Sequence, residues 1–267
     1  MLANPWIAAL VALFLWWFST GAILWVVKRA DQEGPEALRA AAFAALPLLP
    51  LGAWAWASSL FGENAASPYL GFLGTLAIWG WVELAFLAGI ITGPSPYPAP
   101  ATTGGWERFL RAWGTIAYHE LLLIGIFTAM LLAADGAADL TGLFAFAVLF
   151  GARISAKLNL FFGVARFHSE FLPTPLAHLP SHFGRANLNA LFPVSVTALT
   201  ALTALWVQLY FSTSSTGFAL LAMLTALALV EHWLMVLPLP DQKLWRWLIP
   251  APKSTTKPVL RGERHGL

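Results

Sequence analysis

Seven predominantly apolar stretches, each long enough to cross a lipid bilayer, run through the 267-residue chain. A transmembrane helix needs about 20 such residues. Only 10% of the residues are charged, against about 25% in a soluble domain. We therefore expect an all-α integral membrane protein, a bundle of seven transmembrane helices within residues 1–238. The helices are predicted at approximately 6–28, 38–61, 69–92, 109–133, 140–164, 188–212 and 216–238.

The positions of the basic residues predict the orientation of these helices, because loops that stay in the cytoplasm are enriched in Lys and Arg. The basic residues outside the predicted core follow the first, third, fifth and seventh helices. The intervening loops contain Glu63, Asp135 and Asp139 and no basic residue. The N-terminus is thus predicted to lie outside and the C-terminus in the cytoplasm. The basic residues in question are Lys28, Arg29, Arg39, Arg108, Arg111, Arg166, Arg185, Lys243, Arg246, Lys253, Lys257, Arg261 and Arg264.

Residues 239–267 are predicted to form a basic cytoplasmic tail. The segment from Leu244 to Leu248 combines two Trp residues with Arg246, which is typical of a segment at the level of the lipid headgroups. Beyond Pro250 the composition predicts disorder. The sequence pI of about 9.1 is explained by the lipid bilayer as partner, so we expect no nucleic-acid binding.

Proline interrupts the apolar pattern at two places. Pro47 and Pro50 lie inside the second predicted helix, where each removes a backbone donor and so predicts a kink. Residues 93–100 alternate proline with small residues, which predicts an extended cytoplasmic segment. We call residues 93–100 the strap.

Ionisable side chains inside the predicted helices are the most informative residues, since each costs roughly 2.5–3.5 kcal/mol at the bilayer centre. Most lie at a similar depth, roughly 10–15 Å from the cytoplasmic helix ends at about 1.5 Å per residue. Arg153 and Lys157 share one face of the fifth helix, and Ser155 and Asn159 share a second face, so this helix is expected to run through the middle of the bundle. We predict one intramembrane polar cluster made of Glu83, His119, Glu120, Arg153, Lys157, Asn159, Glu231 and His232.

Two interpretations of this cluster remain open. In the first, it is a buried network of ion pairs and hydrogen bonds that fixes helix packing. In the second, it holds a tetrapyrrole or a metal ion, with His119 or His232 as the ligand; Ala228, one turn before His232, would leave room for a macrocycle. A di-iron site requires Glu-x-x-His spacing, whereas His119 and Glu120 are adjacent, so the sequence establishes neither a metal site nor a catalytic residue.

A second histidine motif, from His178 to His182, superficially resembles the histidine boxes of membrane desaturases. Pro180 lies between the two histidines and disfavours a regular helix there. We therefore expect no metal-oxidase centre from this motif.

Six segments carry a resemblance to a known family: WWFSTG at 16–21, WVELAF at 81–86, WGTIAYHE at 113–120, ARISAKLNLF at 152–161, EFLP at 170–173 and EHW at 231–233. They resemble the PuhE family, photosynthetic complex assembly proteins encoded near the reaction-centre H subunit in purple phototrophic bacteria. The resemblance implies a multi-pass protein of the bacterial cytoplasmic membrane that supports assembly of the reaction centre and core antenna or modulates bacteriochlorophyll supply.

The partners implied by this resemblance are assembly intermediates of those complexes or pigment-synthesis proteins. It names no catalytic residue and implies no established catalytic activity. The alternative function is a pigment- or metal-binding membrane enzyme of tetrapyrrole metabolism.

Overall fold

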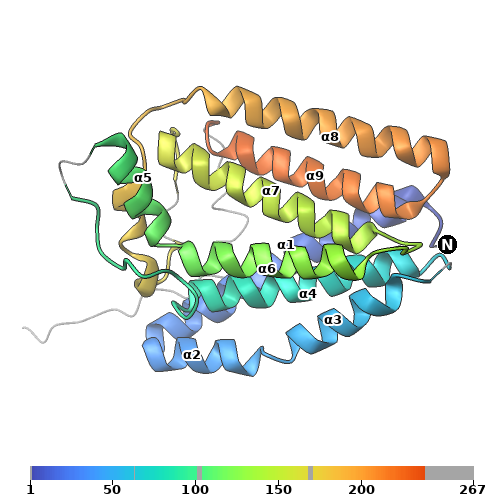
Figure 1. The fold of residues 1–267 in the computed structure, drawn as a ribbon, viewed down its shortest axis with the longest axis horizontal. Helices are drawn as coiled ribbons and strands as arrows, with labels where there is room; N and C mark the ends of the chain where they lie inside the picture. The colour runs from blue at the N-terminus through green and yellow to red at the C-terminus, as the bar shows by residue number, and fades with distance from the viewer. Residues whose placement is uncertain (1, 63, 101–103, 168–170, 238–267) are drawn as a thin grey trace, which may run out of the picture.

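The computed structural model describes residues 2–62, 64–100, 104–167 and 171–237 (Figure 1). Within these ranges the chain forms helices and no strand, which confirms the predicted all-α class. The predicted tail, 239–267, lies outside the described residues. The helices are α1 (Pro5–Glu33), α2 (Pro35–Ala44), α3 (Leu48–Ser59), α4 (Ser67–Leu87), α5 (Gly105–Gly114), α6 (Ala117–Ala133), α7 (Thr141–Phe162), the 3-10 helices η2 (Thr174–Leu176) and η3 (Leu179–His182), α8 (Leu191–Thr213) and α9 (Thr216–Leu234).

Six segments of the described chain are long and apolar enough to cross a membrane: α1, the pair α2 and α3, α4, α7, α8 and α9. The pair α5 and α6 passes the same test together, but the two helices are bent by 70°, so the count becomes seven if this pair is one span. Large apolar side chains such as Phe14, Trp54 and Phe211 face outward, as expected where a helix contacts lipid. The fold is therefore that of a multi-pass membrane protein.

The most enclosed helix is α4, which packs against α1, α3, α7 and α9. Of the 18 most apolar consecutive residues of α4, 61% are buried, whereas 28% of the corresponding residues of α7 are buried. The prediction that the fifth helix, α7, runs through the middle is thus only partly right: α7 contacts α4, α6, α8 and α9, but α4 is the more central. Glycines bring α4 close to α3, because a Cβ on Gly74 would lie 2.6 Å from the carbonyl oxygen of Gly52.

The kink predicted in the second helix is an interruption of three turn residues, 45–47, between α2 and α3, which together still count as one span. Pro47 precedes the first residue of α3 and Pro50 lies in its first turn, where a missing N–H removes no intrahelical hydrogen bond. The predicted start at residue 38 is wrong, because α2 begins at Pro35 and only Gly34 separates it from α1. Because α1 continues to Glu33, Lys28 and Arg29, which were expected in a loop, lie near its C-terminal end.

The single fourth helix predicted from the apolar pattern is wrong, since the chain bends sharply between α5 and α6. The strap and the residue before it cause this bend. The carbonyl of Thr92 accepts the N–H of His119 (3.2 Å), and the N–H of Ser95 donates to the carbonyl of Gly114 (3.1 Å). A Cβ on Gly93 would lie only 2.2 Å from that same Gly114 oxygen. The backbone of this segment occupies the space that a continuous helix would need.

Candidate functional site

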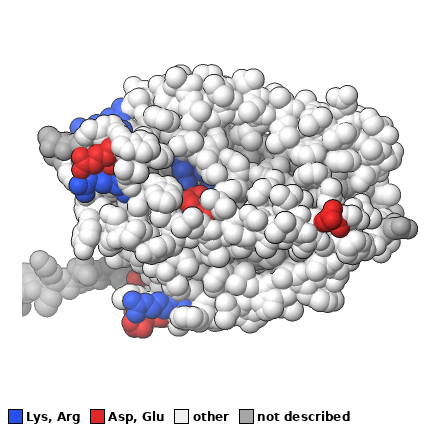
Figure 2. Space-filling model, in the orientation of Figure 1, with Lys and Arg blue, Asp and Glu red and all other residues white. Residues whose placement is uncertain are grey.

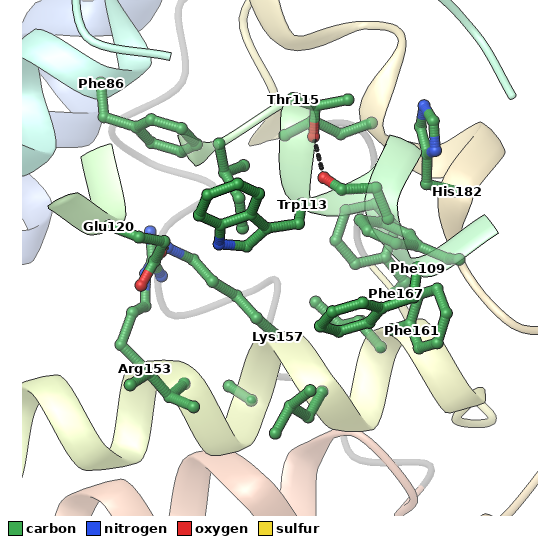
Figure 3. Close-up of a pocket in the computed structure, with 18 of the residues that line it drawn as sticks. Phe86, Phe109, Trp113, Thr115, Glu120, Arg153, Lys157, Phe161, Phe167 and His182 are labelled. Atoms are coloured by element: carbon green, nitrogen blue, oxygen red, sulfur yellow. Dashed lines mark hydrogen bonds and ion pairs between the residues drawn. The ribbon is translucent and has the colours of Figure 1, made fainter. Parts of the chain in front are cut away.

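Five of the predicted cluster residues form one chain of contacts between α4, α6 and α7, which we call the ion-pair chain. Arg153 on α7 donates to Glu83 on α4, with Nη2 and Oε2 2.5 Å apart. One turn further along α7, Lys157 donates to Glu120 on α6. His119 lies between the two pairs: its Nδ1 is 3.3 Å from Oε1 of Glu120, and its Nε2 is 3.7 Å from Oε1 of Glu83. Figure 3 shows Arg153 and Lys157 extending from α7 toward Glu120.

The ion-pair chain is largely withdrawn from solvent. The side chains of Glu83 and Glu120 are each 10% exposed, and that of His119 is fully buried. A buried charge is costly unless it is paired, and each of these carboxylates has a cationic partner. The spacing of the cations follows from the helix, because Arg153 and Lys157 are one turn apart on the same face of α7.

Glu231 on α9 lies near this chain but outside its hydrogen bonds. It lines a cavity of about 340 Å³ together with Glu83 and Arg153. Its carboxylate forms a hydrogen bond with Trp16 of α1 and lies within electrostatic range of Arg153. Glu83, Arg153 and Glu231 thus line one cavity. Among the described interactions of these three residues, the only direct hydrogen bond joins Arg153 to Glu83.

His232 and Asn159 belong to a second network, which joins α7 to α8 and α9. The hydroxyl of Ser155 lies 2.9 Å from Nε2 of His232 and 2.9 Å from the hydroxyl of Ser195 on α8. Nδ1 of His232 lies 2.8 Å from the carbonyl oxygen of Ala228. The Asn159 amide donates to Ser195 (2.9 Å). Both ring nitrogens of His232 are engaged within the protein, so this network resembles helix packing more than a ligand site.

Two members of this second network were missed by sequence reasoning. The side-chain amide of Asn189 donates to the carbonyls of Asn159 (3.2 Å) and Gly163 (2.7 Å), and its oxygen accepts the N–H of Leu191 at the start of α8 (2.9 Å). An Asn just before an apolar run is a helix-capping signal that could have identified Asn189. Ser195 lies within the apolar run of α8, where no pattern marks it.

A larger cavity of about 510 Å³ lies beside the ion-pair chain, between the end of α4, α5, α6, α7 and the 3-10 helices; we call it the aromatic cavity. Arg153, Lys157 and Glu120 line one side of it, and Figure 3 shows His182 on the side away from them. Sequence reasoning assigned His182 no role. The aromatic rings that line the cavity are those of Phe86, Phe109, Trp113, Phe150, Phe161, Phe167 and Phe183.

The strap, α5 and the 3-10 helices form one ordered body at this end of the bundle. Arg108 on α5 donates to the carbonyls of Phe161 (2.7 Å) and His182 (3.1 Å). The strap joins η3 through the N–H of Ala99, which donates to the hydroxyl of Ser181 (2.8 Å). These contacts fix α5 and η3, which line the aromatic cavity, against each other and against the end of α7. Among the described residues, no group of three or more His, Asp or Glu side chains could hold a metal ion by itself.

Comparison with known proteins gives one family and one relative. The model of a family described as a protein of unknown function, DUF3623, matches residues 2–256. The relative is described as an uncharacterized 30.4 kDa protein in the puhA 5′ region of Rhodobacter capsulatus; it is 48% identical over 263 residues, which cover 96% of this chain and 95% of the relative. No solved structure matches the chain. The chain therefore belongs to the DUF3623 family.

Proposed function

We propose that this protein is a PuhE-type assembly factor of the bacterial cytoplasmic membrane, which binds intermediates of the photosynthetic reaction centre and core antenna and influences their supply of bacteriochlorophyll. The observation that carries the proposal is the relative in Rhodobacter capsulatus, which is named for its position 5′ of puhA. Neighbouring bacterial genes commonly serve one process. The six segments that resemble the PuhE family support the same assignment.

We further propose seven spans, with the bent pair α5 and α6 as one of them, the N-terminus outside and the C-terminus in the cytoplasm. The distribution of charge supports this orientation. Figure 2 shows most visible Lys and Arg side chains at the end of the bundle that carries α2 and α5, whereas the opposite end shows only acidic residues on this face. Positive charge marks the cytoplasmic side of a membrane protein.

The contact surface that we propose for a partner is formed by α5 and the strap. Trp106, Leu110 and Trp113 recur at helical spacing along α5 and are 71%, 46% and 43% exposed. Glu107 and Arg111 pair with each other on the same helix. Tyr97 of the strap is 71% exposed. Aromatic residues are enriched in protein interfaces, and a segment held by a rigid scaffold is suited to recognition.

The test is made in a phototrophic bacterium that carries this gene. We expect its deletion to reduce the reaction-centre and core-antenna absorbance of the membranes, and an affinity-tagged copy to capture subunits of both complexes. The variant Trp106→Ala with Leu110→Ala should accumulate normally but capture less. Trp54→Ala, which removes an aromatic residue of similar exposure (66%) from α3, is the matched control and should capture as the wild type does.

Two results would reject the proposal. The first is a deletion strain with unchanged amounts of both complexes under phototrophic growth. The second is a tagged protein that captures neither reaction-centre nor antenna subunits during active assembly.

A further inference from the structure

The charged side chains that line the aromatic cavity are already paired. Lys157 donates to Glu120, which lines the same cavity. Arg153 lines this cavity and the neighbouring one, and its Nη2 lies 2.5 Å from Oε2 of Glu83. A ligand with a net charge would be withdrawn from water without finding a free counter-ion here, which is costly. The lining therefore favours an uncharged ligand.

Arg153 nevertheless keeps hydrogen-bond donors that Glu83 does not use. A guanidinium can donate five hydrogen bonds, and among the described residues Arg153 makes one, from Nη2 to Glu83. Its Nε is buried, whereas its Nη1 is accessible and has no partner in the described part of the chain. The side chain is 37% exposed. Because the charge of Arg153 is already balanced, an uncharged acceptor such as a carbonyl oxygen suits these donors.

The aromatic cavity opens through the outer face of the bundle. Ile124 on α6 and Ile154 on α7 both line it and are 48% and 37% exposed. Figure 2 shows basic and acidic side chains at the surface in the middle of an otherwise uncharged face, where α6 and α7 lie. The charged residues of these two helices are Glu120, Arg153 and Lys157. Since α6 and α7 belong to segments apolar enough to cross a membrane, the opening faces lipid. Charged groups exposed to lipid are costly, so an occupant that covers them stabilises the site.

The remaining lining of the aromatic cavity is apolar and largely aromatic. Figure 3 shows Phe109, Phe161 and Phe167 gathered on the side away from Glu120. Aromatic side chains stack on flat conjugated rings. The volume of about 510 Å³ lies within the range of about 300–1,000 Å³ typical of small-molecule sites. A conjugated ring with a polar atom at one end therefore matches both sides of the cavity.

We propose that the aromatic cavity binds an uncharged, lipid-soluble molecule with a conjugated ring and a carbonyl oxygen, which enters from the membrane between α6 and α7 and accepts a hydrogen bond from Arg153. The aromatic rings hold the body of the ligand, and the carbonyl lies at the ion-pair chain. This inference goes beyond the proposed function and does not rest on it.

The experiment uses the purified full-length chain in an uncharged detergent and prodan, an uncharged naphthalene with a ketone, as the probe. We expect saturable binding in fluorescence anisotropy, above the signal of empty micelles. Ala112 lines the cavity, and Ala112→Trp should weaken binding roughly tenfold or more because the new ring occupies the site. The matched control is Ala129→Trp, at an exposed position of α6 outside the lining, which should bind prodan as the wild type does.

Two analogues of prodan test the class of ligand. Replacement of the ketone by a methylene group removes the acceptor and should weaken binding roughly tenfold. Replacement of the ketone by a carboxylate adds a charge and should also weaken binding, since the cations of the lining are already paired. Equal binding of prodan and the ketone-free analogue would overturn the carbonyl site, and an anion that binds more tightly than prodan would overturn the assignment of an uncharged ligand.

The donor is tested with the double variant Glu83→Met and Arg153→Met, which removes the guanidinium without stranding its carboxylate. In this variant prodan and its ketone-free analogue should bind equally. The carbonyl stretching band of bound prodan should also lose the shift to lower frequency that a hydrogen bond causes. If the double variant is folded, as judged by circular dichroism, and still prefers prodan to the same extent as the wild type, Arg153 is not the donor.

Three further results would contradict the proposal. Equal binding of prodan to folded Ala112→Trp and to Ala129→Trp would overturn its location, and absence of saturable binding to the wild type would overturn the site altogether. If added phosphatidylcholine displaces prodan, membrane lipid is the occupant and the assigned class of ligand is wrong. All of these results leave the assembly function standing, because the deletion strain tests it separately.

Discussion

Replacement of Arg153 by Met tests whether the ion-pair chain holds α4 and α7 together. The variant keeps the length of the side chain but leaves the Glu83 carboxylate, which is 10% exposed, without its cation. His119 does not replace the lost partner, because its Nε2 is 3.7 Å away, beyond hydrogen-bond distance. We expect a substantial loss of folding free energy.

The magnitude follows from burial. Loss of one partner of a buried ion pair costs about 3–5 kcal/mol. Arg153 is 37% exposed, so solvent screening weakens the pair and the low end applies, about 3 kcal/mol. Since every 1.4 kcal/mol is about tenfold, the unfolding equilibrium constant should rise about a hundredfold.

The matched control is Arg111→Met, which breaks an Arg–Glu pair of the same chemistry on the surface of α5. Its two side chains are 46% and 54% exposed, and an exposed pair at this spacing contributes only about 0.3–0.5 kcal/mol. A third protein, Glu83→Met combined with Arg153→Met, removes both charges and should be more stable than Arg153→Met alone, because no charge is stranded.

Unfolding is followed by circular dichroism during titration of detergent-solubilised protein with sodium dodecyl sulfate. The reasoning is refuted if Arg153→Met and Arg111→Met lose equal stability. It is also refuted if the double variant is less stable than Arg153→Met, since the stranded carboxylate would then not be the source of the loss.

Three further predictions concern packing and topology. Gly74→Ala should destabilise the protein by about 1–3 kcal/mol through overpacking. The control is Gly125→Ala, where a Cβ meets nothing within 4 Å; it should be neutral or stabilising by up to about 1 kcal/mol in the same titration. Equal losses of stability in the two variants would contradict the close approach of α3 and α4. Asn159→Ala should cost about 1–3 kcal/mol because it leaves buried partners unsatisfied, and an unchanged unfolding midpoint would show that the second network contributes little. Alkaline phosphatase fused after Ala137 should be active and fused after Leu267 inactive, and the reverse pattern would invert the proposed orientation.

The apolar windows found the six segments that are long and apolar enough to cross a membrane, because the length of such a helix is set by the bilayer. The same pattern could not show the bend between α5 and α6. Its cause is the backbone of residues 92–95, about 20 positions earlier in the chain, and a hydropathy window contains no information on such a contact. The polarity of a residue within a span identified Glu83 and Arg153, since charge is rare there.

The aromatic cavity was beyond sequence reasoning for a different reason. Its lining comes from α4, α5, α6, α7 and the 3-10 helices, and no spacing along one element relates Phe86 to His182. The partition of the predicted cluster was equally hidden. Asn159 and His232 share a depth with Lys157, but Asn159 contacts Ser195 on α8 and His232 of α9 contacts Ser155 on another face of α7. The direction of each side chain depends on how the helices are rotated against one another.

The strap has a mechanical consequence for the molecule. The residue before it, Thr92, accepts the backbone N–H of His119 in the first turn of α6, and the carbonyl of Tyr97 in the strap contacts the imidazole of His182. Displacement of residues 92–100 would therefore break the hydrogen bonds at the first turn of α6 and at the ring of His182 together. A segment outside the transmembrane helices thus ties the N-terminal end of α6 to the 3-10 helix η3.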